Sequence, residues 1–250
     1  MSIPLNCTNR YTATRIAFAI LVALFFAALA GAQTISPVLT EYTGKVAKGS
    51  FELQNAGVVP LTAIMELKSF TVSETGEMSY RALDKGIQVK LSSMSLQIPP
   101  QQSRLVFYEA RADSLPAWFV IYADIGGYKR TSEGMNIRLD LPHTVYILPK
   151  QSARKSDIQI KSLGSSADKA QLRLQVTNNS AWFGRVLSTQ TTGKGSNWQG
   201  SGFPLYPHYS RIVEVPCKVV QKGSALRLRF NRFSLDQPLS DSSGSPVCAP

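Results

Sequence analysis

The chain has 250 residues, of which 44% are hydrophobic and 17% charged, with a formal net charge of +11. This length suits two domains of roughly 100 residues, each large enough to bury its own core. The composition excludes a disordered or fibrous protein, and the scattered Lys and Arg residues lack the aromatic interleaving of nucleic-acid-binding modules, so we expect no nucleic acid partner.

The first 32 residues have the pattern of a secretory signal peptide. Arg10 and Arg15 precede an uncharged apolar run over residues 16–32, and two small-x-small cleavage sites fall within residues 28–32. We therefore predict cleavage and export, which lowers the net charge to +9; the alternative is a retained membrane anchor. No later segment of the sequence is apolar enough to span a bilayer, so we expect no stable membrane insertion after cleavage.

Residues 33–149 have the pattern of short strands separated by turns. β-branched and aromatic side chains with turn-rich flanks indicate strands at residues 50–54, 61–68, 87–91, 104–108, 118–124 and 145–148. Turn chemistry occurs between them, at residues 55–57, 74–76, 99–100 and 126–127.

The clearest strand pattern covers residues 135–141, where apolar and polar residues alternate strictly. A period of two places four apolar side chains on one face of a single strand, namely Met135, Ile137, Leu139 and Leu141. Pro142 follows them and suits an edge strand, because its missing amide then needs no partner. An apolar edge of this kind invites another chain to pair along it, whereas the alternative is that this face packs into the protein's own core.

A polar, proline-flanked stretch at residues 150–156 indicates a domain boundary. Beyond it, strands are predicted at residues 158–160, 172–176, 185–187, 212–215 and 226–230, with a Gly- and Ser-rich loop at residues 193–202. About seven short strands in each half predict an all-β protein with two immunoglobulin-like β-sandwich domains in tandem. The expected organisation is a signal peptide at 1–32 followed by domains at 33–149 and 150–250.

Catalytic and metal-binding motifs are missing from the sequence. His143 and His208 are the only histidines and have no partner at metal-ligand spacing, and no metalloprotease, hydrolase or phosphate-loop motif occurs. We predict a protein that is not an enzyme and needs no metal or cofactor.

The number of cysteines that would remain after cleavage is consistent with export. Cleavage would remove Cys7 and leave Cys217 and Cys248, an even pair that favours a disulfide in an oxidising compartment. The alternatives are two separate thiols, or a nucleophilic Cys217 that meets His208 in space.

The order of several short motifs resembles that of the PapD-like periplasmic pilus chaperones. The motifs that resemble the first domain of that family lie at residues 51–55, 60, 98–105, 115–116 and 118–124, followed by the alternating strand that ends at Pro149. The motifs that resemble its second domain lie at residues 174–180, 203–207 and 211–216. Together they span most of the chain after residue 50.

The resemblance implies a periplasmic chaperone that caps pilus or fimbrial subunits by donor-strand complementation and delivers them to an outer-membrane usher. In that family, the last strand of the first domain inserts alternating apolar side chains into the open groove of an incomplete subunit. The matching residues here are Met135, Ile137, Leu139 and Leu141. Each such side chain contributes about 1.5–3 kcal/mol when fully buried.

One part of the family pattern is absent. Members anchor the subunit's terminal carboxylate with two basic residues in the cleft between domains, and the matching positions here are Leu39 and Thr144, with Arg138 or His143 as nearby substitutes. The missing basic pair supports an alternative function, a secreted immunoglobulin-like adhesion or carbohydrate-binding module without chaperone activity. Three aromatic residues would then be candidates for stacking on a sugar, namely Trp182, Trp198 and Tyr206.

Overall fold

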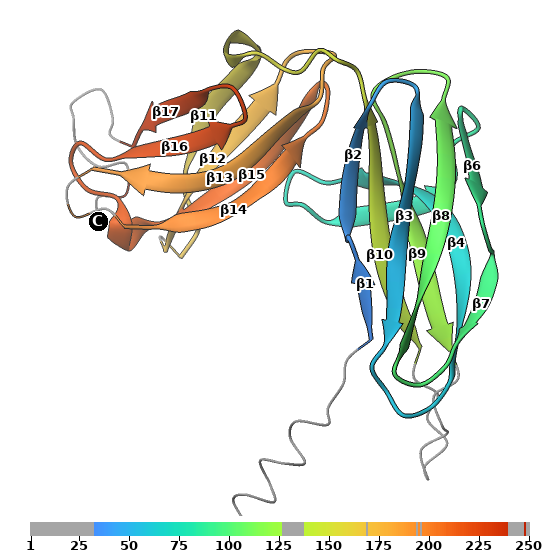
Figure 1. Cartoon of the computed structure of the whole chain (residues 1–250). Coiled ribbons are helices and arrows are strands. Elements are labelled where there is room, and N and C mark those ends of the chain that lie inside the picture. The colour runs from blue at the N-terminus through green and yellow to red at the C-terminus, as the bar shows by residue number, and fades with distance from the viewer. Residues whose placement is uncertain are drawn as a thin grey trace, which may run out of the picture.

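A computed structural model describes residues 33–126, 138–168, 170–193, 195, 197–239 and 248 of the chain. These residues form two β-sandwiches joined by one connection (Figure 1). The predicted signal peptide lies outside the described residues, as do Met135 and Ile137. Within the described part of the chain, no helix is long and apolar enough to cross a membrane.

The first sandwich packs a four-stranded sheet against a six-stranded sheet. The smaller sheet has the order β1-β3-β8-β6, formed by Thr34–Ser36, Val46–Asn55, Gln102–Ala112 and Ile87–Leu91. The larger sheet has the order β2-β10-β9-β4-β5, with β7 also paired to β4, and is formed by Leu39–Thr43, Leu139–Leu148, Ala117–Gly126, Leu61–Val72, Met78–Ala82 and Ser95–Ile98. Alternate side chains of both sheets fill the core, in which Phe51, Phe119 and Ile121 are fully buried.

The second sandwich contains seven strands in two sheets. One sheet has the order β11-β12-β15, formed by Ile158–Ser165, Gln171–Asn178 and Tyr209–Pro216, and the other has the order β14-β13-β16-β17, formed by Gln199–Leu205, Gly184–Thr192, Ala225–Phe230 and Ser234–Pro238. Its core is separate from that of the first sandwich and includes Leu172, Val215 and Leu228. The predicted fold, all-β with two immunoglobulin-like sandwiches, is confirmed.

A buried asparagine ends one strand in each sandwich. Asn55, the last residue of β3, donates from Nδ2 to the carbonyls of Val59, Ile98 and Pro99 at 2.8–3.2 Å. Asn178, the last residue of β12, donates to the carbonyls of Trp182, Leu205 and Tyr206 at 2.7–3.2 Å. Each asparagine therefore joins its own turn to a neighbouring part of the sandwich, and each satisfies carbonyls that would otherwise be buried without a donor.

Two predicted segment boundaries were wrong. Residues 135–141 and 145–148 were expected as separate strands, but β10 runs without a break from Leu139 to Leu148. Four of the ten residues of the predicted loop at 193–202 belong to a strand, because β14 begins at Gln199. Gly202 lies in this strand so close to β13 that an added Cβ would clash with the Val186 carbonyl oxygen, so the glycine marks a close backbone approach rather than a loop.

Cys217 and Cys248 form a disulfide, with their Cα atoms 5.5 Å apart. Cys217 begins the 3-10 turn η2 (Cys217–Val219), and the bond attaches Cys248 to the edge of the second sandwich. A disulfide sulfur is not a thiolate nucleophile, so this structure gives Cys217 no catalytic role with His208.

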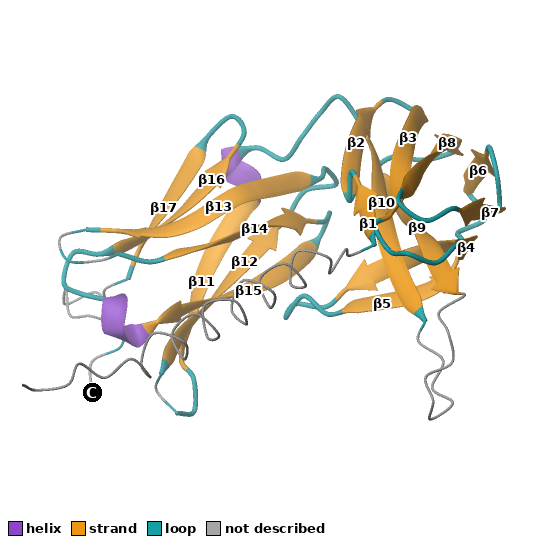
Figure 2. Cartoon of the chain, turned by 60° about the horizontal axis from the view of Figure 1, so that its bottom comes forward, coloured by secondary structure: helices purple, strands orange, loops and turns teal. Residues whose placement is uncertain are grey.

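Several contacts join the sandwiches, among them the ion pair between Glu41 and Arg185. An aromatic cluster spans the interface, with the Tyr146 and Tyr206 hydroxyls 3.0 Å apart; its other members are Phe70, Val120 and Phe183. The β4–β5 hairpin reaches the second sandwich separately, where the Glu74 carbonyl accepts a hydrogen bond from the Ile212 amide at 2.8 Å. Figures 1 and 2 show the turn of this hairpin beside β15.

Candidate functional site

The candidate site is the N-terminal half of β10, the strand that contains the described part of the alternating pattern. β9 pairs with residues 139–147 of β10, whereas β2 pairs with residues 144–148 on the opposite side. Among the described residues, positions 139–143 therefore have a strand partner on one side only. The other side is an open sheet edge, which is a template for pairing with another chain.

Burial along the core-directed face of β10 decreases from the C-terminal half of the strand to its N-terminal half. His143, Val145 and Ile147 are fully buried, whereas Leu139 and Leu141 are half-buried and pack against the margin of the first core. The apolar face thus lies inside the sandwich in the C-terminal half of the strand and becomes partly exposed to solvent in its N-terminal half. Of the four residues predicted from the alternation, Met135 and Ile137 lie outside the described residues.

The open edge still has backbone groups that a strand could use. The Thr144 amide donates to the Val38 carbonyl at 2.8 Å, so it points away from β9. Because backbone groups alternate along a strand, the amides and carbonyls of residues 140 and 142 point the same way. Pro142 lacks an amide, which leaves the Asp140 amide as the donor of this open edge.

An ion pair fixes the start of β10. The Arg138 guanidinium donates to Asp124 Oδ1 at 2.6 Å and also to Oδ2, and it lies 3.9 Å from the Glu66 carboxylate. Asp124 belongs to β9 and is buried, and these hydrogen bonds raise the pKa of Arg138. This forked pair joins the residue just before β10 to the neighbouring strand.

His143 is enclosed in the middle of β10 by a network of polar groups. Its Nδ1 lies 2.6 Å from the Pro37 carbonyl oxygen and its Nε2 lies 3.1 Å from the Tyr108 hydroxyl. The carbonyl can only accept, so Nδ1 carries the proton and Nε2 accepts from Tyr108. Tyr108 in turn contacts the hydroxyls of Thr40 and Tyr42, both at 2.9 Å. Burial lowers the pKa of His143, so the neutral ring is the form that this network holds.

We expect the free energy of unfolding to decrease as the pH falls below about 6.5, the pKa of an unperturbed histidine. The unfolded chain takes up the proton first because the pKa of His143 is lowered in the folded state. The contribution of His143 is therefore complete above about pH 6.5 and is lost towards the lowered folded pKa, by at most about 1.4 kcal/mol per pH unit.

Urea unfolding of the wild type and of His143→Gln at pH 7.5 and 5.0 measures this effect. The difference in stability between the two proteins should be smaller at the lower pH, since only the wild type loses the contribution of His143. His208 is present in both proteins and cancels. An unchanged difference would show that His143 does not titrate in this range.

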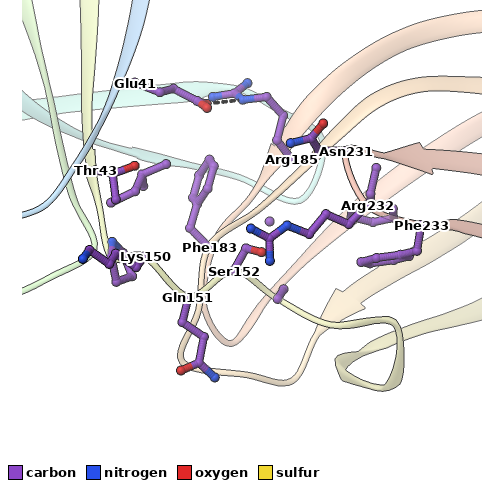
Figure 3. Close-up of a pocket in the computed structure, with 15 residues that line it drawn as sticks. Glu41, Thr43, Lys150, Gln151, Ser152, Phe183, Arg185, Asn231, Arg232 and Phe233 are labelled. Carbon is purple, nitrogen blue, oxygen red and sulfur yellow. Dashed lines mark hydrogen bonds and ion pairs between the residues drawn. The ribbon is translucent and has the colours of Figure 1, made fainter.

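The two positions matched to the family's carboxylate anchor do lie together. Leu39 and Thr144 are register partners across β2 and β10, but neither carries a charge. Of the suggested substitutes, Arg138 is bound to Asp124, and His143 is enclosed with a lowered pKa. Three cations do line the cleft between the sandwiches (Figure 3), namely Lys150, Arg185 and Arg232.

The aromatic residues proposed to stack on a sugar do not form an exposed platform. Tyr206 is 6% exposed and belongs to the interface cluster, while Trp182 and Trp198 pack against the second core. The hypothesis of a carbohydrate-binding module therefore loses its candidate sugar-stacking residues and keeps only the missing basic pair as support. In the described ranges, no three His, Cys, Asp or Glu side chains are close enough together to hold a metal ion.

Known structures share this arrangement of two sandwiches. The SafB chaperone of Salmonella enterica, solved in complex with the SafA pilin, matches with a TM-score of 0.53 and 10% identity over 83% of this chain and 96% of that one. The E. coli chaperone DraB matches with a TM-score of 0.52 and 11% identity over 83% and 97%. The chain has the pilus-chaperone fold.

A third chaperone of this fold, the class 5 fimbriae chaperone CfaA, gives a TM-score of 0.50 and 12% identity over 82% of this chain and 98% of that one. No family model and no curated protein matches the sequence. At these identities, the likeness to the pilus chaperones establishes the fold alone.

The polar groups that support the site were not predicted from the sequence. Asp124 ends a predicted strand of apolar residues, and a carboxylate in that position is itself a sign of a buried partner. The partner Arg138 was considered only as a substitute anchor. The contact between His143 and Tyr108 joins residues of different sheets, and nothing in the local sequence indicates it.

Proposed function

We propose that this chain is a periplasmic chaperone that captures pilus or other surface subunits by donor-strand complementation and delivers them to an outer-membrane usher. One observation carries the proposal: residues 139–143 of β10 have a paired strand on one side only, and the two leucines of this segment are half-buried. We take residues 33–149 as the domain that grips the subunit and residues 150–250 as the second domain.

Capture would proceed by strand addition at this edge. A strand of the subunit would bond to the Asp140 amide and to the carbonyls of Asp140 and Pro142, while the subunit's open core would cover Leu139 and Leu141. Continued alternation would place Met135 and Ile137 in the same row. Burial of apolar surface and backbone pairing supply the driving force, so capture itself needs no nucleotide, metal or catalytic residue.

The terminal carboxylate of a subunit would find only a weak partner at the expected position. Thr144 can donate one neutral hydrogen bond, which is about half as strong as the charge-assisted bond of a basic residue. We therefore infer that the affinity for a subunit depends mainly on β10.

Affinity purification of the full chain from a periplasmic extract of the producing bacterium tests the proposal. Mass spectrometry should identify co-purified sandwich subunits that lack their own final strand. Asp140→Pro should abolish this co-purification, since it removes the amide donor of the open edge, whereas Asp140→Ala should retain it. The proposal fails if no such subunit is recovered, or if the proline variant recovers it as well as the alanine variant does.

A further inference from the structure

Net charge is distributed very unevenly between residues 33–149 and residues 150–250. Residues 33–149 contain 11 Lys and Arg and 11 Asp and Glu, whereas residues 150–250 contain 14 Lys and Arg and only 5 Asp and Glu. The second half therefore carries the whole net charge of +9 that remains without the first 32 residues.

Part of this charge surrounds two adjoining cavities at the junction of the sandwiches. The first, of about 220 Å³, lies between Glu41 and Thr43 of β2 and the loop at residues 231–233. The second, of about 290 Å³, shares five lining residues with the first, namely Gln151, Ser152, Ala153, Arg232 and Phe233. We call the two together the junction groove. Its cations are Lys150, Arg154, Lys155, Arg185 and Arg232.

Four of these cations are exposed and have no ion-pair partner among the described residues: Lys150, Arg154, Lys155 and Arg232. Glu41, the single carboxylate that the described residues contribute to the groove lining, is already bound to Arg185. Figure 3 shows Arg185 turned towards Glu41, whereas Arg232 extends towards Ser152 and Phe183. The groove therefore has a large excess of unneutralised positive charge.

Arg185 has a further unused donor. Its guanidinium carbon lies 5.0 Å from the centre of the Tyr146 ring and 5.4 Å from that of Phe183, and its Nη2 is buried without a hydrogen-bond partner in the described part of the chain. A buried guanidinium nitrogen without an acceptor is unfavourable unless a ligand supplies one.

The walls of the groove are apolar. Phe183 and Phe230 are buried, Phe233 is stacked on Phe230 with ring centres 4.4 Å apart, and Leu148 is half-buried. Cations above apolar walls suit a ligand that carries both carboxylates and apolar side chains. A flat lipid surface could reach the exposed lysines, but its headgroups would not enter a groove between two sandwiches.

We propose that the junction groove binds an acidic segment of a partner polypeptide, in an extended form that places carboxylate side chains on Arg232 and Lys150 and apolar side chains against Phe183 and Phe233. The inference does not depend on the capture of subunits at β10. It concerns a different part of the surface, formed by β2, β13, the last residue of β10, the connection between the sandwiches and the 231–233 loop, and a partner recognised by its negative charge.

Fluorescence anisotropy with a labelled, C-terminally amidated peptide of alternating aspartate and leucine tests this proposal on the full chain. At about 0.15 M salt, where exposed charges more than about 8 Å apart are screened, Lys150→Gln with Arg232→Gln should raise the Kd roughly tenfold. The matched control is Lys218→Gln with Lys222→Gln, which removes the same charge from exposed residues outside the groove and should change the Kd less than about twofold.

Three results would overturn the proposal. Equal losses in the two double variants would mean that the peptide responds only to net charge. Equal binding of an asparagine-leucine peptide with a free C-terminus would show that the groove takes a terminal carboxylate and not acidic side chains. Groove-dependent binding to phosphatidylglycerol vesicles without binding of the peptide would identify a lipid surface instead. None of these results bears on capture at β10.

Discussion

Replacement of both Leu139 and Leu141 by aspartate should abolish subunit capture. Each leucine is half-buried in the free protein, so covering the rest of its surface contributes about 1 kcal/mol. A carboxylate in the same position would have to enter the subunit's apolar groove, which costs several kcal/mol more. We expect the Kd for a purified subunit, measured by calorimetry, to rise at least 100-fold, or about 3 kcal/mol.

The control for this prediction introduces two aspartates on the outer face of the other sheet of the first sandwich. Leu105 and Phe107 of β8 are 56% and 58% exposed on the outer surface of the other sheet. Their replacement by aspartate introduces the same two charges and should leave the Kd within about twofold of the wild type. Circular dichroism must show that both double variants are folded, since the β10 leucines also contact the core. Equal affinities of the two variants would exclude β10 as the strand that binds the subunit.

The strands with continuous alternation could be predicted from sequence, and the short or polar ones could not. Residues 87–91 were predicted as a strand with the bounds that β6 has, because Ile87, Val89 and Leu91 turn to one face. β1 and β2 together hold eight residues and include Thr, Ser and Glu, so they lack a pattern that stands out from a loop. Their positions are set by pairing with β3 and β10, which are distant in sequence.

The alternating pattern alone could not show that the N-terminal half of β10 is partly exposed whereas its C-terminal half is buried. Leu141 and Val145 occupy equivalent positions in a period of two, yet Val145 is fully buried and Leu141 is not. The difference arises because β2 begins opposite Thr144 and does not extend beside Leu141, and where a neighbouring strand begins is a tertiary feature. The family resemblance placed Leu39 and Thr144 at matching positions of the anchor, and they are register partners, but only the structure shows which cations line the cleft.

Asn178→Ala should lower the free energy of unfolding by about 3–5 kcal/mol, an effect as large as that of deleting a core leucine. Asn178 is fully buried, and its Nδ2 lies within 3.2 Å of three carbonyl oxygens, those of Trp182, Leu205 and Tyr206. Its Oδ1 accepts from the Ser180 amide at 3.1 Å. Alanine would leave the carbonyls without their shared donor and open a polar cavity, and each group left unsatisfied costs about 1–3 kcal/mol.

The adjacent residue supplies the matched control. Asn179 is exposed, and among the described residues its side chain makes no hydrogen bond, so Asn179→Ala should change the stability by less than about 0.5 kcal/mol. Urea unfolding followed by tryptophan fluorescence measures both variants. Because Tyr206 also belongs to the aromatic cluster between the sandwiches, loosening its carbonyl should weaken that contact. We therefore expect Asn178→Ala to separate the unfolding of the two sandwiches into distinct transitions, whereas equal stabilities of the two variants would show that the buried asparagine does not hold its turn.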